Sequence, residues 1–171
     1  IDKGIEPVPI SVNISREYIH TFDVVGEMLH LVNKYDIPIK LLELEITETT
    51  DSEGVSDVVQ KMKDAGFTML MDDFGSGYSS LNMLQKTQFD VLKIDRGFLS
   101  EFMESIRGRK IISHTISMSR DIGLDIIAEG VETPEQASFL SDCGCDSAQG
   151  FYYSKPITQE EFDKMLVEVN K

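Results

Sequence analysis

The chain has 171 residues, of which 41% are hydrophobic and 27% are charged, and its formal net charge is −14. This composition is typical of one globular domain with a sizeable core, and no apolar run reaches the roughly 18 residues that a membrane helix needs. The negative charge argues against partners such as polymeric nucleic acid or an anionic membrane, because both would be repelled. The first residues also lack the basic-then-apolar layout of a signal peptide. We therefore predict a cytoplasmic or cytoplasm-facing domain.

Short apolar, β-rich runs alternate with stretches of helical periodicity along the whole chain. The expected strands are residues 9–15, 41–47, 67–73, 91–95, 125–131 and 147–153. The expected helices are residues 16–35, 53–65, 79–87, 97–122, 134–143 and 158–170, the fourth of which is long enough to be two helices broken near Gly108. This alternation predicts an α/β fold with a parallel sheet. Two architectures compete, an open doubly wound sheet and a TIM-like (β/α) barrel, which normally has eight units and at least about 200 residues.

Every expected strand carries a polar side chain, usually near its carboxyl end, where a buried parallel strand would normally be apolar. These side chains are Asn13, Glu45, Asp72, Asp73, Lys93, Glu129 and Gln149. In parallel α/β folds the ligand binds where the carboxyl ends of the strands meet. Separate strand-end caps are the alternative, but so many polar groups in one sheet are better explained by one shared site, because each would be costly to bury alone.

The oxygen ligands among these residues predict a site for divalent cations. They are Asn13, Glu45, Asp72 and Asp73. Carboxylate and amide oxygens suit Mg²⁺ or Mn²⁺ and not zinc, which prefers histidine and cysteine. Adjacent carboxylates near a third can hold two metals, an arrangement that hydrolyses phosphodiesters. Lys93 would then orient the water or the phosphate, and Glu129 would bind a metal through water or accept a proton.

At these residues the chain resembles the EAL family of cyclic di-GMP phosphodiesterases, over essentially its whole length. Six segments match the family's motifs in the family's order: SVNIS, ELEITET, MDDFGSGYSSL, LKIDRGFL, IIAEGVET and QGFYYSKP. The third segment has Ser76 where threonine is commoner in the family. The resemblance implies a TIM-like barrel whose first strand runs antiparallel to the others, and a single EAL-type domain over residues 1–171.

The resemblance also implies the activity, which is hydrolysis of cyclic di-GMP to linear pGpG with Mg²⁺ or Mn²⁺, with Ca²⁺ as an inhibitor. It implies metal ligation by Asn13, Glu45, Asp72 and Asp73, with Asp72 as the bridge, and catalytic roles for Lys93, Glu129 and Gln149. Lys93 would position the water, Glu129 would act through water or as a base, and Gln149 would hydrogen-bond nearby. Glu48 would anchor the loop after Asp73, and that loop would also form a homodimer contact. A sensor or GGDEF domain would accompany the parent chain.

One departure from the family concerns the region before Asn13. The Glu-Ala-Leu motif, whose glutamate is a further metal ligand, and a nearby arginine belong to an earlier strand, and no such strand precedes Asn13 in this sequence. We therefore expect six of the eight βα units, a parent domain that hydrolyses cyclic di-GMP, and little turnover by the isolated chain. The alternatives are a cyclic di-GMP receptor without catalysis and an inert interaction fragment.

Overall fold

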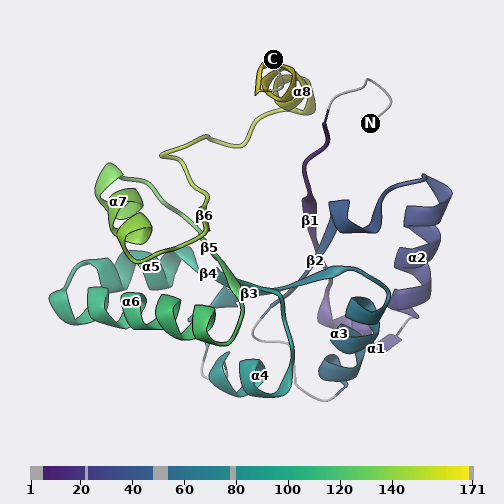
Figure 1. The fold of residues 1–171 in the computed structure, drawn as a ribbon, viewed down its shortest axis with the longest axis horizontal. Helices are drawn as coiled ribbons and strands as arrows, with labels where there is room; N and C mark the ends of the chain where they lie inside the picture. Colours follow the sequence, from purple (N-terminus) through teal and green to yellow (C-terminus); the bar gives the residue numbers. More distant parts are fainter. Residues whose placement is uncertain (1–5, 22, 48–53, 78–79, 170–171) are drawn as a thin grey trace.

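The computed structural model describes residues 6–21, 23–47, 54–77 and 80–169, and its core is one six-stranded sheet. The strands are β1 (Ile10–Asn13), β2 (Leu42–Thr47), β3 (Thr68–Phe74), β4 (Val91–Ile94), β5 (Asp125–Ala128) and β6 (Ser147–Ala148). Every neighbouring pair is parallel, and the strands follow one another in chain order from β1 to β6. A doubly wound sheet would reverse its strand order at a switch point. The observed order therefore confirms the TIM-like alternative, as a curled half-barrel (Figure 1).

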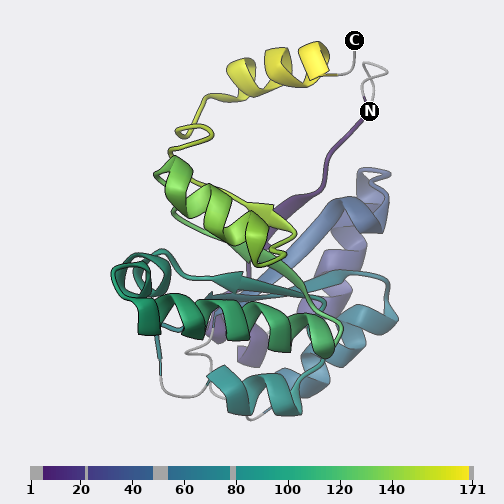
Figure 2. The ribbon, with the colours of Figure 1, turned by 60° about the vertical axis from the view of Figure 1, so that its left-hand side comes forward.

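Helices follow the strands and lie on the convex side of the sheet (Figures 1 and 2). They are α1 (Arg16–Thr21), α2 (Val24–Lys34), α3 (Val55–Asp64), α4 (Ser80–Lys86), α5 (Arg96–Met103), α6 (Ile106–Asp121), α7 (Pro134–Asp142) and α8 (Gln159–Val169), with a short 3₁₀ helix at Ile39–Leu41. Helix α8 differs from the others because it has no buried residue and stands apart from the sheet (Figure 1). No helix in the described ranges is both long and apolar enough to cross a membrane.

The core fills the space between the convex face of the sheet and the helices. On β2, Leu44 and Ile46 are fully buried and belong to the same apolar cluster as Met62 of α3. A second cluster joins β4 and β5 to the following helices, for example through Ile126 and Ile112. Because strand side chains alternate between faces, the polar partners of these apolar residues point to the concave side. This alternation places the predicted site residues on the inside of the half-barrel.

The expected helix at residues 16–35 is interrupted in the structure. It forms two helices, of which α1 ends at Thr21 and α2 begins at Val24. The reason is Asp23, whose Oδ1 accepts a hydrogen bond from the Gly26 backbone N–H at 3.1 Å and so caps a new helix.

The expected long helix at residues 97–122 is also two helices, but the break comes before Gly108. It lies between Met103 and Ile106, where the Ser105 hydroxyl caps α6 by accepting from the Gly108 N–H at 2.9 Å. Gly108 instead permits a close approach, because a Cβ atom there would lie 2.0 Å from the Phe102 carbonyl oxygen. Glycine therefore lets α6 pack tightly against the end of α5.

The expected strand at residues 147–153 was too long, since β6 ends at Ala148. The chain turns beyond it, with the backbone N–H groups of Tyr153 and Ser154 both donating to the Gly150 carbonyl. These bonds close a turn within the residues that were expected to continue the strand. Gly150 also approaches the neighbouring backbone closely, because a Cβ atom there would lie 2.2 Å from the Val131 carbonyl oxygen.

Candidate active site

The ammonium of Lys93 is the meeting point of three strand ends. Its Nζ lies 2.9 Å from Glu45 Oε1, 3.0 Å from Asp72 Oδ1 and 2.7 Å from Glu129 Oε1. Glu45 is on β2, Asp72 is on β3, and Glu129 comes directly after β5. Glu45, Asp72 and Lys93 are all buried. The structure therefore brings together four of the polar residues that the strand pattern singled out.

The side chains of Asp72 and Asp73 both reach this site because β3 has a bulge at these two residues. Met71 pairs with Leu92 and Phe74 with Ile94, so the register shifts across the two aspartates. Asp73 has a φ of +58°, and its N–H donates to Asp72 Oδ1 at 3.0 Å. In a regular strand, neighbouring side chains would point to opposite faces. With the bulge, one carboxylate oxygen from each aspartate and one from Glu129 lie within 4.8 Å of one another.

The other two predicted residues, Gln149 and Asn13, lie at the two ends of the sheet. The Gln149 side-chain amide donates to Glu129 Oε1 at 2.7 Å, which places it beside the cluster. Asn13 ends β1 and lies directly opposite Glu45 in the strand register. It is exposed, like the rest of β1. Glu48 lies outside the described residues, so its anchoring role stays a prediction.

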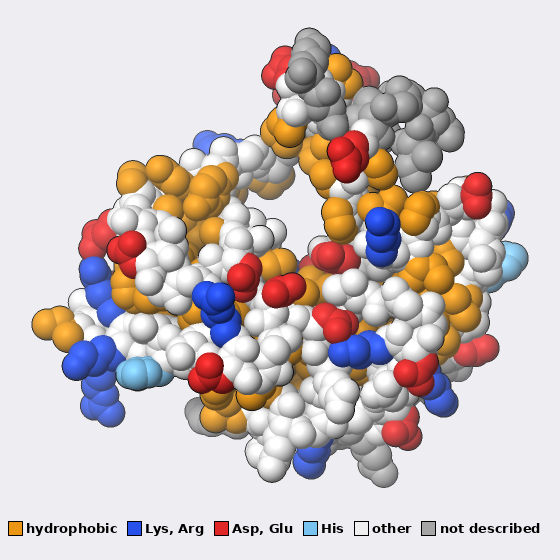
Figure 3. Space-filling model, in the orientation of Figure 1, with side chains coloured by type: hydrophobic (Ala, Val, Ile, Leu, Met, Phe, Trp, Pro, Cys, Tyr) orange, Lys and Arg blue, Asp and Glu red, His pale blue; other side chains and the backbone are white. Residues whose placement is uncertain are grey.

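A cavity opens next to the carboxylate cluster, on the side of β5 and β6. Its lining includes Arg96, Glu129, Glu132, Gln149, Phe151 and Lys155. In the space-filling view, acidic side chains lie along the lower edge of the hollow between the sheet and the carboxyl-terminal segment (Figure 3). The combination of carboxylates, two cations and an aromatic ring suits a ligand that carries both phosphate and a flat ring.

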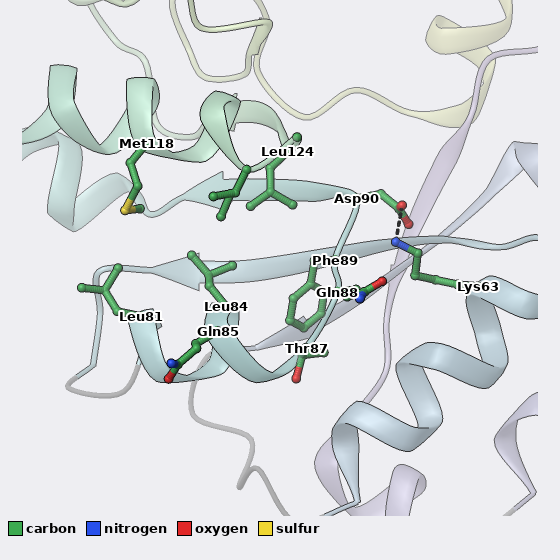
Figure 4. A pocket seen from close by; sticks show the side chains of 12 residues that line it. Lys63, Leu81, Leu84, Gln85, Thr87, Gln88, Phe89, Asp90, Met118 and Leu124 are labelled. Carbon is green, nitrogen blue, oxygen red and sulfur yellow. Dashed lines mark ion pairs between the residues drawn. The ribbon is translucent and has the colours of Figure 1, made fainter.

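A second pocket lies near the opposite ends of the strands and has different chemistry. Leu81 and Met118 line it, and Lys63 Nζ pairs with Asp90 Oδ1 at 2.7 Å at one end (Figure 4). Asp90 immediately precedes β4, so this pocket is at the amino side of the sheet. It lacks a carboxylate cluster, and in parallel α/β folds catalysis occurs at the carboxyl side. The first cavity is therefore the candidate active site.

The model of the family described as EAL domain matches residues 2–156. The chain belongs to this family. It is 34% identical over 170 residues to the signaling protein YkoW of Bacillus subtilis, covering 98% of this chain and 21% of that protein. It is 31% identical over 166 residues to the cyclic di-GMP phosphodiesterase NbdA of Pseudomonas aeruginosa, covering 95% of this chain and 21% of that protein. This EAL domain thus spans about a fifth of the length of both relatives.

Solved structures show the same fold. The PaMucR phosphodiesterase in its c-di-GMP complex matches with a TM-score of 0.83 at 34% identity, covering 90% of this chain and 64% of that chain. The EAL domain of Mycobacterium smegmatis DcpA matches with a TM-score of 0.88 at 32% identity, covering 95% of this chain and 74% of that chain. These likenesses confirm the TIM-like class that the sequence predicted. Helix α8 lies beyond the residues that the family model matches.

The EAL domain holds more negative than positive charge at its site. Burial lowers the pKa of Lys93, but hydrogen bonds from its ammonium to the three carboxylates outweigh burial and raise this pKa above the ordinary value. Burial raises the pKa of Glu129, an effect that Lys93 partly offsets. Burial and the neighbouring charge of Asp72 raise the pKa of Asp73. Proton uptake by these carboxylates would relieve the repulsion, and so would a divalent cation.

The donor set of this EAL domain fits a divalent metal. The group formed by Asp72, Asp73 and Glu129 is the one place in the described ranges where three or more His, Cys, Asp or Glu side chains converge closely enough to hold an ion. Its ligand atoms are hard carboxylate oxygens, which Mg²⁺ and Mn²⁺ prefer. Glu45 is not part of this group, but its Oε1 contacts the same Lys93 ammonium as Asp72 does.

Two residues at this site were missed from the sequence. Arg96 Nη2 lies 2.7 Å from Glu132 Oε1, and both side chains line the candidate cavity. A signal was available, because Arg96 follows Lys93 by three residues and Glu132 follows Glu129 by three residues. Residues just past the strand ends form the loops that surround the site in barrels. Arg96 and Glu132 each lie one residue past an expected strand, so strand alternation alone does not indicate them.

Proposed function

We propose that this EAL domain takes part in the hydrolysis of one phosphodiester bond of cyclic di-GMP, giving linear pGpG with Mg²⁺ or Mn²⁺. The convergence of Asp72, Asp73 and Glu129 within 4.8 Å, next to the buried Lys93, carries this proposal. The names of relatives support the substrate, because NbdA is a cyclic di-GMP phosphodiesterase and PaMucR was solved in its c-di-GMP complex.

The metal ligands in this proposal are those that the sequence predicted: Asn13, Glu45, Asp72 and Asp73. Asp72 would be the shared ligand, since its carboxylate lies close to that of Asp73 and contacts the same ammonium as Glu45. Bound divalent cations supply charge neutralisation at the phosphate and lower the pKa of an attacking water. The Lys93 ammonium lies among the same carboxylates, so we expect its contacts to rearrange when metal binds.

The remaining residues would handle the water and its proton. In the reaction the water oxygen bonds to phosphorus, the bond from phosphorus to the 3′ oxygen breaks, and the 3′ oxygen takes up a proton. Lys93 would orient the water or the phosphate through its ammonium. Glu129 would accept a proton, a role that its raised pKa favours, because a base is most effective when its pKa approaches the working pH. Gln149 would hold the Glu129 carboxylate through their 2.7 Å hydrogen bond.

The predicted homodimer is proposed on the side of the loop after Asp73. A groove there is lined by Gly75 and Gly77 of this loop, by Phe98 of α5 and by Ile111 of α6. Its apolar lining supports a contact between copies, with the loop linking that contact to Asp73. A sensor or GGDEF domain in the parent chain, and a cytoplasmic location, belong to the same proposal.

Hydrolysis of cyclic di-GMP with Mn²⁺ tests the proposed function. We expect Asp72→Asn to abolish hydrolysis by a longer form that carries the family's Glu-Ala-Leu segment. The isolated chain should turn over slowly, because no Glu-Ala-Leu sequence occurs in it. Asp125→Asn is a matched control, since Asp125 is an exposed aspartate at the start of β5. Full activity of Asp72→Asn would exclude the metal-bridging role.

Calorimetry on the isolated chain separates the remaining alternatives. Cyclic di-GMP is titrated in the presence of Ca²⁺, which we expect to support binding without hydrolysis. Binding that disappears in Asp72→Asn would show that the half-barrel retains a metal-dependent ligand site. No binding at any ligand concentration would favour the inert interaction fragment.

A further inference from the structure

The Arg96 side chain crosses the turn that follows Glu129. Arg96 is the first residue of α5, and its Nη2 lies 2.7 Å from Glu132 Oε1. Between these two residues the arginine stem lies over Gly130, because a Cβ atom there would be 2.2 Å from Arg96 Cγ and 2.8 Å from Arg96 Cδ. The side chain therefore forms a strap that runs from α5 across the turn to Glu132.

The turn under this strap begins directly after Glu129, whose carboxylate also contacts Lys93 and Gln149. The Glu129 N–H donates to the Ile94 carbonyl at 3.0 Å, which ties this segment to the end of β4. Gly130 then has a φ of +66°, a left-handed conformation that favours glycine. Val131 is fully buried, and its N–H donates to the Gln149 carbonyl at 3.0 Å. The chain thus changes direction within two residues of the carboxylate.

Both ends of the strap are fixed independently of each other. On the α5 side, Asp95 caps the helix by accepting from the Gly97 N–H at 2.8 Å and the Phe98 N–H at 3.2 Å. On the other side, the Glu132 N–H donates to Gln136 Oε1 at 2.7 Å, as part of the capping of α7. A link between two anchored elements restricts the segment that lies between them.

We infer that the Arg96–Glu132 pair is a positioning device, which holds the turn and thereby keeps the Glu129 carboxylate close to Asp72 and Asp73. The two side chains are 63% and 42% exposed, so the pair contributes little to global stability. Its effect is local, because Arg96 and Glu132 line the same cavity as Glu129 and Gln149. Only the metal-binding consequence rests on the proposed function.

Amide hydrogen exchange of the metal-free chain tests the device directly. We expect Arg96→Gln and Glu132→Gln each to speed exchange of the Glu129 and Val131 amides by about two- to fivefold, the range in which exposed ion pairs act. The double variant should show no further increase, because both single changes remove the same link. Arg96→Lys keeps the positive charge but lacks the several N–H donors of the planar guanidinium. Its effect on amide exchange should therefore be intermediate.

Glu135→Gln is the matched control. Glu135 also pairs with one arginine, Arg109, and also lies at the start of α7. Its pair does not cross Gly130, so exchange at Glu129 and Val131 should stay at the wild-type rate. The Ile126 amide is an internal reference, since it donates to Asp146 Oδ2 and not to the turn.

Titration with Mn²⁺, followed by electron paramagnetic resonance, measures the consequence for the cluster. Arg96→Gln and Glu132→Gln should weaken Mn²⁺ binding by about two- to fivefold, and Glu135→Gln should not.

The inference is overturned if neither Arg96→Gln nor Glu132→Gln changes amide exchange, or if their effects on exchange add fully. It is also overturned if Arg96→Gln alone weakens nucleotide binding, which would make Arg96 a ligand contact. A wild-type chain that binds no Mn²⁺ would count against the proposed function, while the exchange rates would still decide the inference.

Discussion

The single ammonium of Lys93 lies among the carboxylates of Glu45, Asp72 and Glu129, and Asp73 adds a fourth negative group. Without a metal, repulsion among these carboxylates therefore destabilises the folded state, and interactions elsewhere in the fold must offset this cost. Sites of this kind commonly sacrifice stability for function. Two substitutions test these opposing contributions to stability separately. One removes a negative charge from the site, and the other removes its positive charge.

Asp73→Asn should stabilise the metal-free chain. The pKa of Asp73 is raised by burial and then by Asp72, so its ionisation begins to cost stability as the pH rises above about 3.8, and the cost is complete once the pH exceeds the pKa of the folded state. Asparagine also tolerates the left-handed backbone at this position. We expect the melting temperature at neutral pH to rise by about 1–3 °C. The gain should vanish at pH values below about 3.8, where the aspartate is protonated in both states.

The same variant should lose stabilisation by metal. Mn²⁺ is expected to raise the melting temperature of the wild-type chain, and Asp73→Asn should reduce this rise because it removes a ligand. Asp125→Asn, at an exposed position on β5, is the control for a lost aspartate charge. A metal-free variant that melts below the wild type would contradict the proposed repulsion.

Lys93→Met should destabilise the metal-free chain strongly. It keeps the length of the side chain but leaves the buried Glu45 and Asp72 carboxylates without their cation. Breaking a buried ion pair by removing one partner typically costs about 3–5 kcal/mol. Urea unfolding measures this loss, and Mn²⁺ should restore part of it. Lys63→Met removes a more exposed ion pair with Asp90 and should cost much less.

At the scale of elements, the sequence predicted the site through strand alternation. Glu45 and Lys93 lie on the concave face because the apolar residues beside them, such as Leu44, pack under helices. The pairing of Asp72 with Asp73 could not be predicted in this way, because alternation sends neighbours to opposite faces. Only the bulge and the positive φ of Asp73 bring both carboxylates to one side. Such a local irregularity depends on tertiary contacts and has no signature in apolar periodicity.

Gly108→Ala tests the contact between α5 and α6. Alanine favours helices more than glycine does, so helix propensity alone predicts an increase of about 1 kcal/mol in the free energy of unfolding. The new Cβ atom would instead meet the Phe102 carbonyl oxygen at 2.0 Å, and backbone atoms cannot give way easily. We expect a net loss of about 2–3 kcal/mol in urea unfolding.

Gly26→Ala provides a matched comparison for this prediction. Gly26 occupies the same position after the Asp23 cap of α2 as Gly108 does after the Ser105 cap of α6. The atom nearest to its new Cβ is the end of the Asp23 side chain, which can rotate away at the cost of a cap, about 1 kcal/mol. Equal losses in the two variants would mean that backbone crowding at Gly108 is not the cause.

At the scale of the whole molecule, the half-barrel leaves two strands at the edges of the sheet, β1 and β6. Strand β1 has no buried residue, and its Ile10 and Val12 are 58% and 39% exposed. The solved EAL structures extend further than this chain, which covers 64% of PaMucR and 74% of DcpA. An apolar edge strand is a template for pairing with another chain. Association of the isolated chain can therefore arise in two places, at β1 or at the proposed homodimer groove.

Sedimentation velocity on single-site variants distinguishes these two kinds of association. We expect the isolated chain to form oligomers that grow with concentration, because pairing of the β1 edge of one copy with the β6 edge of the next leaves a free edge at each end of the assembly. Val12→Lys should shift the chain toward smaller species, since charge on an edge strand opposes pairing. Ile111→Glu, in the groove beside the loop after Asp73, should remove only a discrete dimer. If Val12→Lys leaves the oligomers unchanged while Ile111→Glu yields monomers, the groove alone accounts for association and the β1 edge is protected in solution.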